Sequence, residues 1–164
     1  MTLSRLAIVS SLVMLAGAVA VSAHVPLQPP GAVHGQVSLA IGGTTLTTAG
    51  PAECNHSAGA SIYEAPGRMW AARQQGSTGG VNLTLWRLAR GGDMFTLSVT
   101  AGGRTHRVNT LTVGPASDRR GSGTAVIATL GKGGQFTISA VADTGVTING
   151  TITCSAFTAP EDNG

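Results

Sequence analysis

The stretch GTAVIATLGKGGQFTISAVADTGVTINGTITCSAF, residues 123–157, carries the clearest structural pattern of the 164-residue chain. In its last part, apolar residues ending with Ile152 and Cys154 alternate with polar ones, mostly threonine. An alternation with a period of two is typical of a strand with one buried face. Residues 135–142 show the same alternation, so the stretch predicts consecutive antiparallel strands.

Short glycine-bearing segments separate these strands. Residues 131–134 and 143–145 have the composition and length of hairpin turns. The first strand, residues 124–130, is apolar on both faces, which predicts a strand that is covered on both sides. The core should contain Leu83, Leu97, Val99, Phe136, Ile138, Val146, Ile148 and Ile152. The comparatively exposed positions should be Thr137, Thr147, Thr151 and Thr153.

Two further hairpins are predicted from Gly-Gly pairs between alternating runs. Gly42-Gly43 joins residues 36–41 to 44–48, and Gly102-Gly103 joins residues 94–101 to 104–113. A two-residue turn with glycine at both positions sets the register of the strands that it connects. The first turn places Leu46 opposite Leu39, and the second places Val99 opposite His106.

The region between these hairpins has a weaker pattern. Residues 49–60 read as a loop, and residues 61–65 and 69–74 read as short strands around a Pro66-Gly67 turn. Residues 81–88 form a strand with Trp86 on its polar side. The chain as a whole predicts an all-β fold, an antiparallel β-sandwich of about nine strands over residues 35–157, with a closed β-barrel as the alternative.

The amino-terminal residues predict export. Residues 1–23 combine Arg5, an apolar run and a small-residue cleavage site ending at Ala23, as in a secretory signal peptide. Residues 24–34 form a proline-rich lead-in, and residues 158–164 form a flexible tail. No later segment is apolar enough to span a membrane, so we expect a secreted, periplasmic or cell-envelope protein without a transmembrane segment after cleavage.

Export makes the two cysteines of the chain, Cys54 and Cys154, informative. An even cysteine count in an exported protein predicts a disulfide bond. Metal binding is the weaker alternative, because a structural zinc site takes four ligands.

The composition restricts the function. A net charge of +3, with 10% charged and 4% aromatic residues, does not form the basic surface of a nucleic-acid-binding protein. No spacing of nucleophile and base predicts catalysis, and the glycine pairs lie in turns rather than before helices. We therefore expect a non-catalytic domain without a cofactor, which binds an extracellular or envelope ligand through its surface.

A few motifs resemble the mycobacterial lipoprotein antigen family. They are the early cysteine Cys54, the strand with Gly133, Gly134, Phe136 and Ile138, and the closing Ile-Thr-Cys-Ser at residues 152–155. The resemblance implies an envelope-exposed β-domain with one disulfide. This chain differs from that family because it has no lipidation cysteine after the leader.

Copper binding is the alternative function. Cleavage after Ala23 would leave His24 with a free α-amino group beside its imidazole, which resembles the copper brace of lytic polysaccharide monooxygenases. Nitrogen ligands in a tetragonal arrangement suit Cu(II). The third nitrogen would come from His34, His56 or His106, and His106 is the best placed because it lies on a predicted strand.

Overall fold

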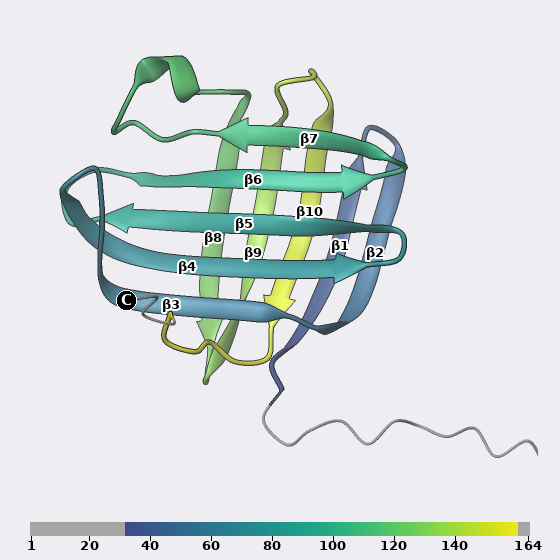
Figure 1. The fold of residues 1–164 in the computed structure, drawn as a ribbon, viewed down its shortest axis with the longest axis horizontal. Helices are drawn as coiled ribbons and strands as arrows, with labels where there is room; N and C mark the ends of the chain where they lie inside the picture. Colours follow the sequence, from purple (N-terminus) through teal and green to yellow (C-terminus); the bar gives the residue numbers. More distant parts are fainter. Residues whose placement is uncertain (1–31, 161–164) are drawn as a thin grey trace, which may run out of the picture.

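The computed structural model describes residues 32–160, which form ten strands in two sheets of five (Figure 1). The first sheet has the strand order β2-β1-β10-β9-β8, and the second has the order β3-β4-β5-β6-β7. All strand pairs are antiparallel. The elements are β1 (His34–Ile41), β2 (Thr44–Pro51), β3 (Glu53–Ile62), β4 (Ala65–Gly76), β5 (Gly79–Leu88), β6 (Asp93–Ala101), β7 (Arg104–Asn109), the 3-10 helix η1 (Ala116–Asp118), β8 (Ser122–Leu130), β9 (Gly133–Val141) and β10 (Thr147–Cys154).

The two sheets lie face to face, and the strands of one cross those of the other (Figure 1). Each sheet keeps two edge strands, so the predicted sandwich is confirmed and the closed barrel is wrong. None of the residues from 32 to 160 belongs to a helix that is long and apolar enough to cross a membrane.

Both Gly-Gly hairpins have the predicted register. Leu39 pairs with Leu46, and Val99 pairs with His106. Gly42 and Gly43 have φ values of 55° and 90°, as a two-residue hairpin turn requires. The turn chemistry of these glycines thus sets which residues face the core.

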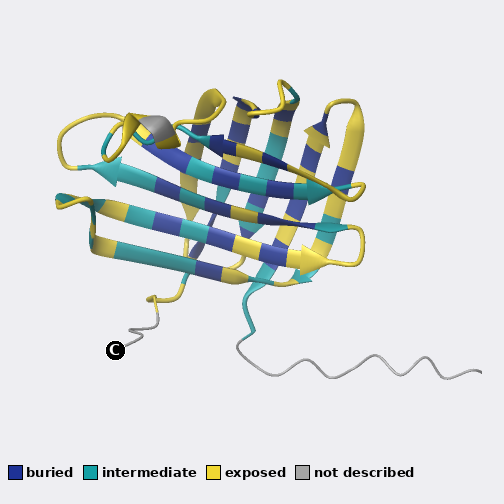
Figure 2. Cartoon of the chain, turned by 45° about the horizontal axis from the view of Figure 1, so that its top comes forward, coloured by how far each residue is buried: buried dark blue, intermediate teal, exposed yellow. Residues whose placement is uncertain are grey.

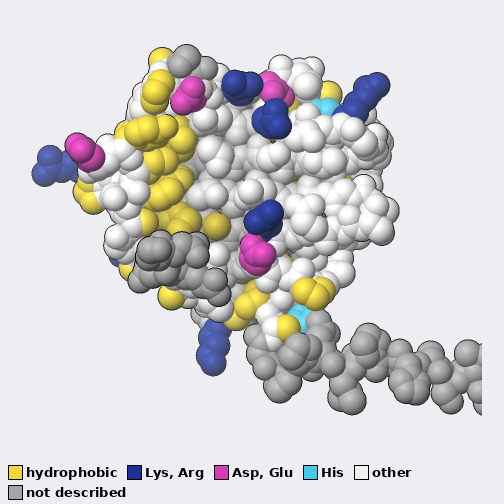
Figure 3. Space-filling view, viewed as in Figure 1, with side chains coloured by type: hydrophobic (Ala, Val, Ile, Leu, Met, Phe, Trp, Pro, Cys, Tyr) yellow, Lys and Arg dark blue, Asp and Glu magenta, His cyan; other side chains and the backbone are white. Residues whose placement is uncertain are grey.

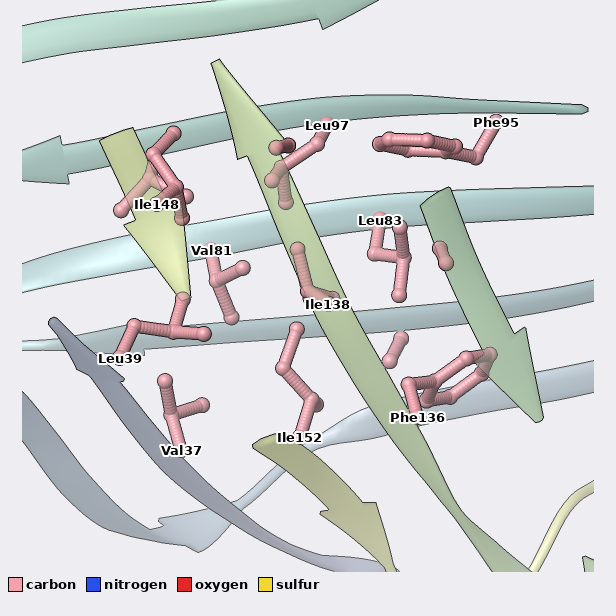
Figure 4. Close-up of a cluster of buried hydrophobic side chains, with 14 of the residues drawn as sticks. Val37, Leu39, Val81, Leu83, Phe95, Leu97, Phe136, Ile138, Ile148 and Ile152 are labelled. Atoms are coloured by element: carbon pink, nitrogen blue, oxygen red, sulfur yellow. The ribbon is translucent and has the colours of Figure 1, made fainter. Parts of the chain in front are cut away.

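The core lies between the sheets, where inward side chains alternate with outward ones (Figures 2 and 4). Seven of the eight predicted core residues are buried, and Val146 is half-buried because it precedes β10. Thr137 and Thr147 are exposed. Thr151 and Thr153 are half-buried, and so are less buried than Ile152 and Cys154 beside them. The faces of β9 and β10 are therefore assigned correctly from their alternation.

The predicted disulfide is present. Cys54 of β3 and Cys154 of β10 are bonded at 1.98 Å, and both residues are buried. Since β3 belongs to the second sheet and β10 to the first, this bond connects the two layers of the sandwich.

The predicted loop over residues 49–60 is wrong. Strand β2 continues to Pro51 and pairs with β1, and β3 begins at Glu53. Gly50 adopts a φ of 150°, a value that glycine tolerates without interrupting the pairing. Residues 58 and 59 form a bulge in β3. Glycine in a strand at a bulge or a close approach thus resembles glycine in a loop at the level of sequence.

The predicted Pro66-Gly67 turn is also misplaced. Both residues lie in β4, and the turn is at Tyr63-Glu64, with φ values of 46° and 64°. Positive φ is uncommon for residues other than glycine, so the sequence carries no signal for a turn here.

Strand β8 corrects the expectation of a strand covered on both sides. It is an edge strand of the first sheet, and the outward side chains of Val126 and Leu130 are 54% and 65% exposed. Only alternate residues, Ala125 and Ile127, reach the core. An apolar run therefore marked an exposed edge rather than a doubly covered strand.

The leader at residues 1–23 and most of the lead-in lie outside the described residues. At the other end, Thr158 pairs with Asn55 of β3. The pairing of the β-domain therefore reaches Thr158, where the tail was expected to start.

Candidate functional site

The outer face of the second sheet carries three rows of side chains, each formed across neighbouring strands. Side chains directly opposite each other in antiparallel strands lie about 4.5–5.5 Å apart, and successive outward residues of one strand lie about 6.8 Å apart. The rows therefore form one continuous surface, which we call the outer face. Figure 3 views the molecule from this side.

The first row is apolar. Met69 of β4 pairs with Trp86 of β5, which pairs with Met94 of β6. Met94 is 1% exposed, and Met69 and Trp86 are half-buried, as is Ala71 beside them. Hydrophobic side chains gather over the ends of β4, β5 and β6 on the left of Figure 3. We call Met69, Ala71 and Trp86 the apolar patch.

The second and third rows are polar and border a groove of about 280 Å³. Thr84 pairs with Thr96 in the second row, and Asn82 pairs with Ser98 in the third. Arg107 of β7 follows Ser98 in the third row. We call this hollow the polar groove. A tryptophan and a methionine thus lie one row away from the threonine hydroxyls and two rows away from the amide and guanidinium groups.

The hydroxyl groups of the polar groove are available to a ligand. The side chains of Thr84, Thr96 and Ser98 have no hydrogen-bond partner among residues 32–160. They are half-buried, so each can form a hydrogen bond with a bound molecule.

The inward side of the second sheet ends in an aromatic and charged cluster. The Trp70 ring stacks on the His56 ring with a centroid distance of 4.6 Å, and the Arg87 guanidinium lies 5.4 Å from the Trp70 ring. Arg87 donates two hydrogen bonds to Asp93, at 2.8 and 2.7 Å, which raise the pKa of the guanidinium. Trp70 is only 4% exposed, so this cluster closes the end of the core and offers no ring face to a ligand.

The predicted copper ligands are only partly described. His106 is buried, and its Nδ1 atom lies 2.9 Å from the Thr144 hydroxyl. His24 lies outside the described residues. Within residues 32–160, no three His, Cys, Asp or Glu side chains lie close enough to hold a metal ion. A copper site at His24 therefore stays a prediction.

The histidines show no catalytic pairing in the part of the chain that the structure describes. The Nδ1 atom of His56 lies 2.9 Å from the Met69 carbonyl oxygen, and that of His106 bonds the Thr144 hydroxyl. Neither imidazole forms a hydrogen bond to a serine or a carboxylate in that region. The expected absence of catalysis stays a prediction.

Sequence reasoning did not identify the outer face as a site. The signal was present in one strand, since Trp86 lies on the same side of β5 as Asn82 and Thr84. A large aromatic residue on the polar face of a strand is exposed unless something covers it. The three rows themselves depend on how β4 to β7 pair, which the sequence does not specify.

Comparison of the chain with protein-family models, with curated proteins and with solved structures gives no match. The resemblance to the mycobacterial lipoprotein antigens therefore stays a prediction, and the function rests on the geometry of this chain.

Proposed function

We propose that this chain is an exported, non-catalytic binding module whose ligand lies on the outer face of the second sheet. The observation that carries the proposal is the apolar patch beside the polar groove. Binding sites commonly combine an apolar or aromatic surface with a few polar groups that orient the ligand. The disulfide between Cys54 and Cys154 supports an oxidising compartment, and the signal-like residues 1–23 support secretion or the cell envelope as that compartment.

The chemistry of the outer face favours an amphiphilic ligand. The indole of Trp86 offers an apolar surface with one N–H donor, and the neighbouring threonine and serine hydroxyls both donate and accept hydrogen bonds. Arg107 adds a positive charge at the end of the third row. A ligand with one apolar surface and several hydroxyl or amide groups fits these neighbours.

Fragment mapping by two-dimensional NMR tests the proposal without a known ligand. Isopropanol and N-methylacetamide serve as small amphiphilic probes of the mature protein. We expect the largest amide shifts on β4 to β7 around the apolar patch, because these probes collect where apolar surface adjoins unpaired polar groups.

Two variants provide the comparison. Trp86→Ala should abolish the shifts at the outer face, and Thr47→Ala, on the exposed side of β2, should leave them unchanged. Shifts that gather elsewhere, or that persist in Trp86→Ala, would show that the outer face is not the binding surface.

A further inference from the structure

The free edge of β8 is a second surface of interest, separate from the outer face. In the part of the chain that the structure describes, β8 has a neighbouring strand on one side only. An edge strand presents unpaired backbone N–H and C=O groups, which are a template for pairing with another strand. Natural proteins commonly block such edges, so an unblocked edge is informative.

Both edges of the second sheet are partly blocked. On β3, the His56 N–H donates to the Thr158 carbonyl at 2.9 Å, and the Thr158 N–H donates to the Cys54 carbonyl at 2.9 Å. On β7, Asn109 exchanges two backbone hydrogen bonds with Arg120. Short segments of the chain thus take the place of an additional strand at each of these edges.

The β9–β10 turn covers β7 further. The Asp143 N–H donates to the Arg107 carbonyl at 2.8 Å, and the Arg107 N–H donates to the Asp143 carboxylate at 3.1 Å. The other edge of the first sheet, β2, has polar outward side chains such as Thr45 and Thr47 and ends at Pro51. Of the edges, β8 has the least protection.

The composition of β8 suits strand addition. Residues Ser122–Leu130 include no charged residue and no proline, the two devices that commonly prevent edge pairing. Three of the four large hydrophobic side chains exposed in the described region lie on or next to this strand: Val126, Leu130 and Val141. An added strand with apolar outward side chains would extend this surface.

The second sheet projects beyond β8 and forms a ledge over the vacant position. Figure 1 shows β4, β5 and β6 continuing past β8, and Figure 2 shows the same projection from another angle. On β4, β5 and β6, the buried inward residues nearest the projecting ends are Trp70, Leu85 and Phe95. The next inward residues, two positions further along, are Arg68, Arg87 and Asp93, and none of these is buried.

The size of the ledge fits one strand. Two residues span about 6.8 Å along a strand, and neighbouring strands lie about 4.8 Å apart. Because the sheets cross, moving along β5 toward its projecting end means moving across the first sheet, from β8 to the vacant position beside it. One strand added at that position would therefore lie opposite Arg68, Arg87 and Asp93. We propose that β8 takes an extended segment of a second polypeptide, with apolar side chains outward and acidic side chains facing this ledge.

The charges of the ledge select this occupant. Arg87 and Asp93 neutralise each other in an ion pair of 2.7 Å. Arg68 is exposed and has no ion pair with any residue that the structure describes, so the ledge has one positive charge in excess. An acidic side chain on the inward face of the added strand would pair with Arg68.

Two other occupants fit less well. Symmetric antiparallel pairing of two β8 strands places both second sheets on the same side, so the two ledges would compete for one space. The chain's own residues 24–31 contain Pro26, Pro29 and Pro30, which have no N–H to donate to a sheet.

The test uses two synthetic peptides with the mature, oxidised protein. The acidic peptide is acetyl-Thr-Val-Glu-Val-Thr-Val-Glu-Val-Thr-amide, and in the basic peptide lysine replaces both glutamates. We expect the acidic peptide to bind and to protect from hydrogen exchange the edge-facing β8 amides, those that do not bond to β9. The basic peptide should bind at least about tenfold more weakly, because it places like charges beside Arg68.

Variants locate the site. Val126→Lys places a charge on the edge and should abolish binding, whereas Thr47→Lys on β2 is the matched control and should not change it. Arg68→Glu should reverse the preference between the two peptides. Circular dichroism of each variant checks that the fold is retained.

Four results would overturn the proposal. They are no binding of the acidic peptide, equal binding of both peptides, protection of the edge-facing β8 amides in the free protein that rises with protein concentration, and protection of the same amides in the free protein at all concentrations. The third would assign the edge to a second copy of the chain, and the fourth to the chain's own residues.

Discussion

Opening the Cys54–Cys154 disulfide should cost this domain a large part of its stability. The bond joins residues 100 positions apart and connects β3 of the second sheet to β10 of the first. It therefore restricts the unfolded chain from β3 to β10. In the chain-entropy model, a closed loop of this length contributes about 4.7 kcal/mol to the free energy of unfolding.

The measured loss should be about 2–5 kcal/mol, the usual range for a native disulfide of a small secreted domain. Contacts around the bond do not reduce this value. Thr158 bonds the Cys54 carbonyl, but such native hydrogen bonds do not restrict the unfolded chain. Typical domains have a total free energy of unfolding of only about 5–15 kcal/mol, so the reduced protein would be marginally stable.

The assay is urea unfolding of the oxidised and reduced protein, followed by tryptophan fluorescence and circular dichroism. The m-value should rise on reduction, because the unfolded chain without its cross-link exposes more surface. The double variant Cys54→Ala with Cys154→Ala should lose at least as much stability, since both side chains are buried. Its stability should not respond to reductant.

A loss below about 1 kcal/mol on complete reduction, with the fold retained, would refute the reasoning. It would mean that the unfolded chain is already held compact by other contacts, so that the cross-link removes little conformational freedom.

Two further predictions follow from the core and from the histidines. Ile148→Ala should lower the free energy of unfolding by about 2–5 kcal/mol, because Ile148 is fully buried. The control is the neighbouring exposed residue: Thr147→Ala should change the free energy of unfolding by less than about 0.5 kcal/mol. Equal losses for the two variants in urea unfolding would contradict the assignment of the two faces of β10. If the copper prediction is correct, protein that begins at His24 should bind Cu(II) in a calorimetric titration, and an additional residue before His24 should abolish the binding. Unchanged affinity in the extended protein would disprove the amino-terminal copper brace.

The sequence predicted the parts of the fold that local chemistry determines. Gly42 and Gly43 can adopt positive φ, so a two-residue turn and the pairing of Leu39 with Leu46 followed directly. The alternation in β9 and β10 assigned their buried faces for the same local reason. Both inferences required only a turn type and a period of two.

The misplaced elements depend on interactions between distant residues. Tyr63 and Glu64 form a turn with positive φ, although neither residue type favours it. The Tyr63 ring lies against Gly114, where an added Cβ atom would approach it to 2.4 Å. A contact between two residues that are 51 positions apart in the sequence leaves no local pattern.

The position of β8 could not be read from its composition. An apolar strand of this length fits both a strand covered on two faces and an edge strand with an exposed outer face, and the arrangement of the layers and the strand order, which the sequence does not specify, decide between them. The outer face has the same limitation. The alternation in the sequence places Trp86 on the polar face of its strand. Its neighbours Met69 and Met94, however, come from β4 and β6, whose pairing with β5 only the structure shows.

The crossing of the two sheets explains why the ledge beside β8 exists. In crossed layers, the strand ends of one sheet extend beyond the edge strand of the other, as β4 to β6 do beyond β8 (Figure 1). The inward residues at those ends cannot be apolar without exposing apolar surface to water, and here they are Arg68, Arg87 and Asp93. The same projection gives a charged ledge above a free backbone edge on the inner side of the second sheet, whose outer side carries the apolar patch and the polar groove. A ligand on the outer face and a strand at β8 would therefore contact opposite sides of one sheet, so this fold can bind both without competition between them.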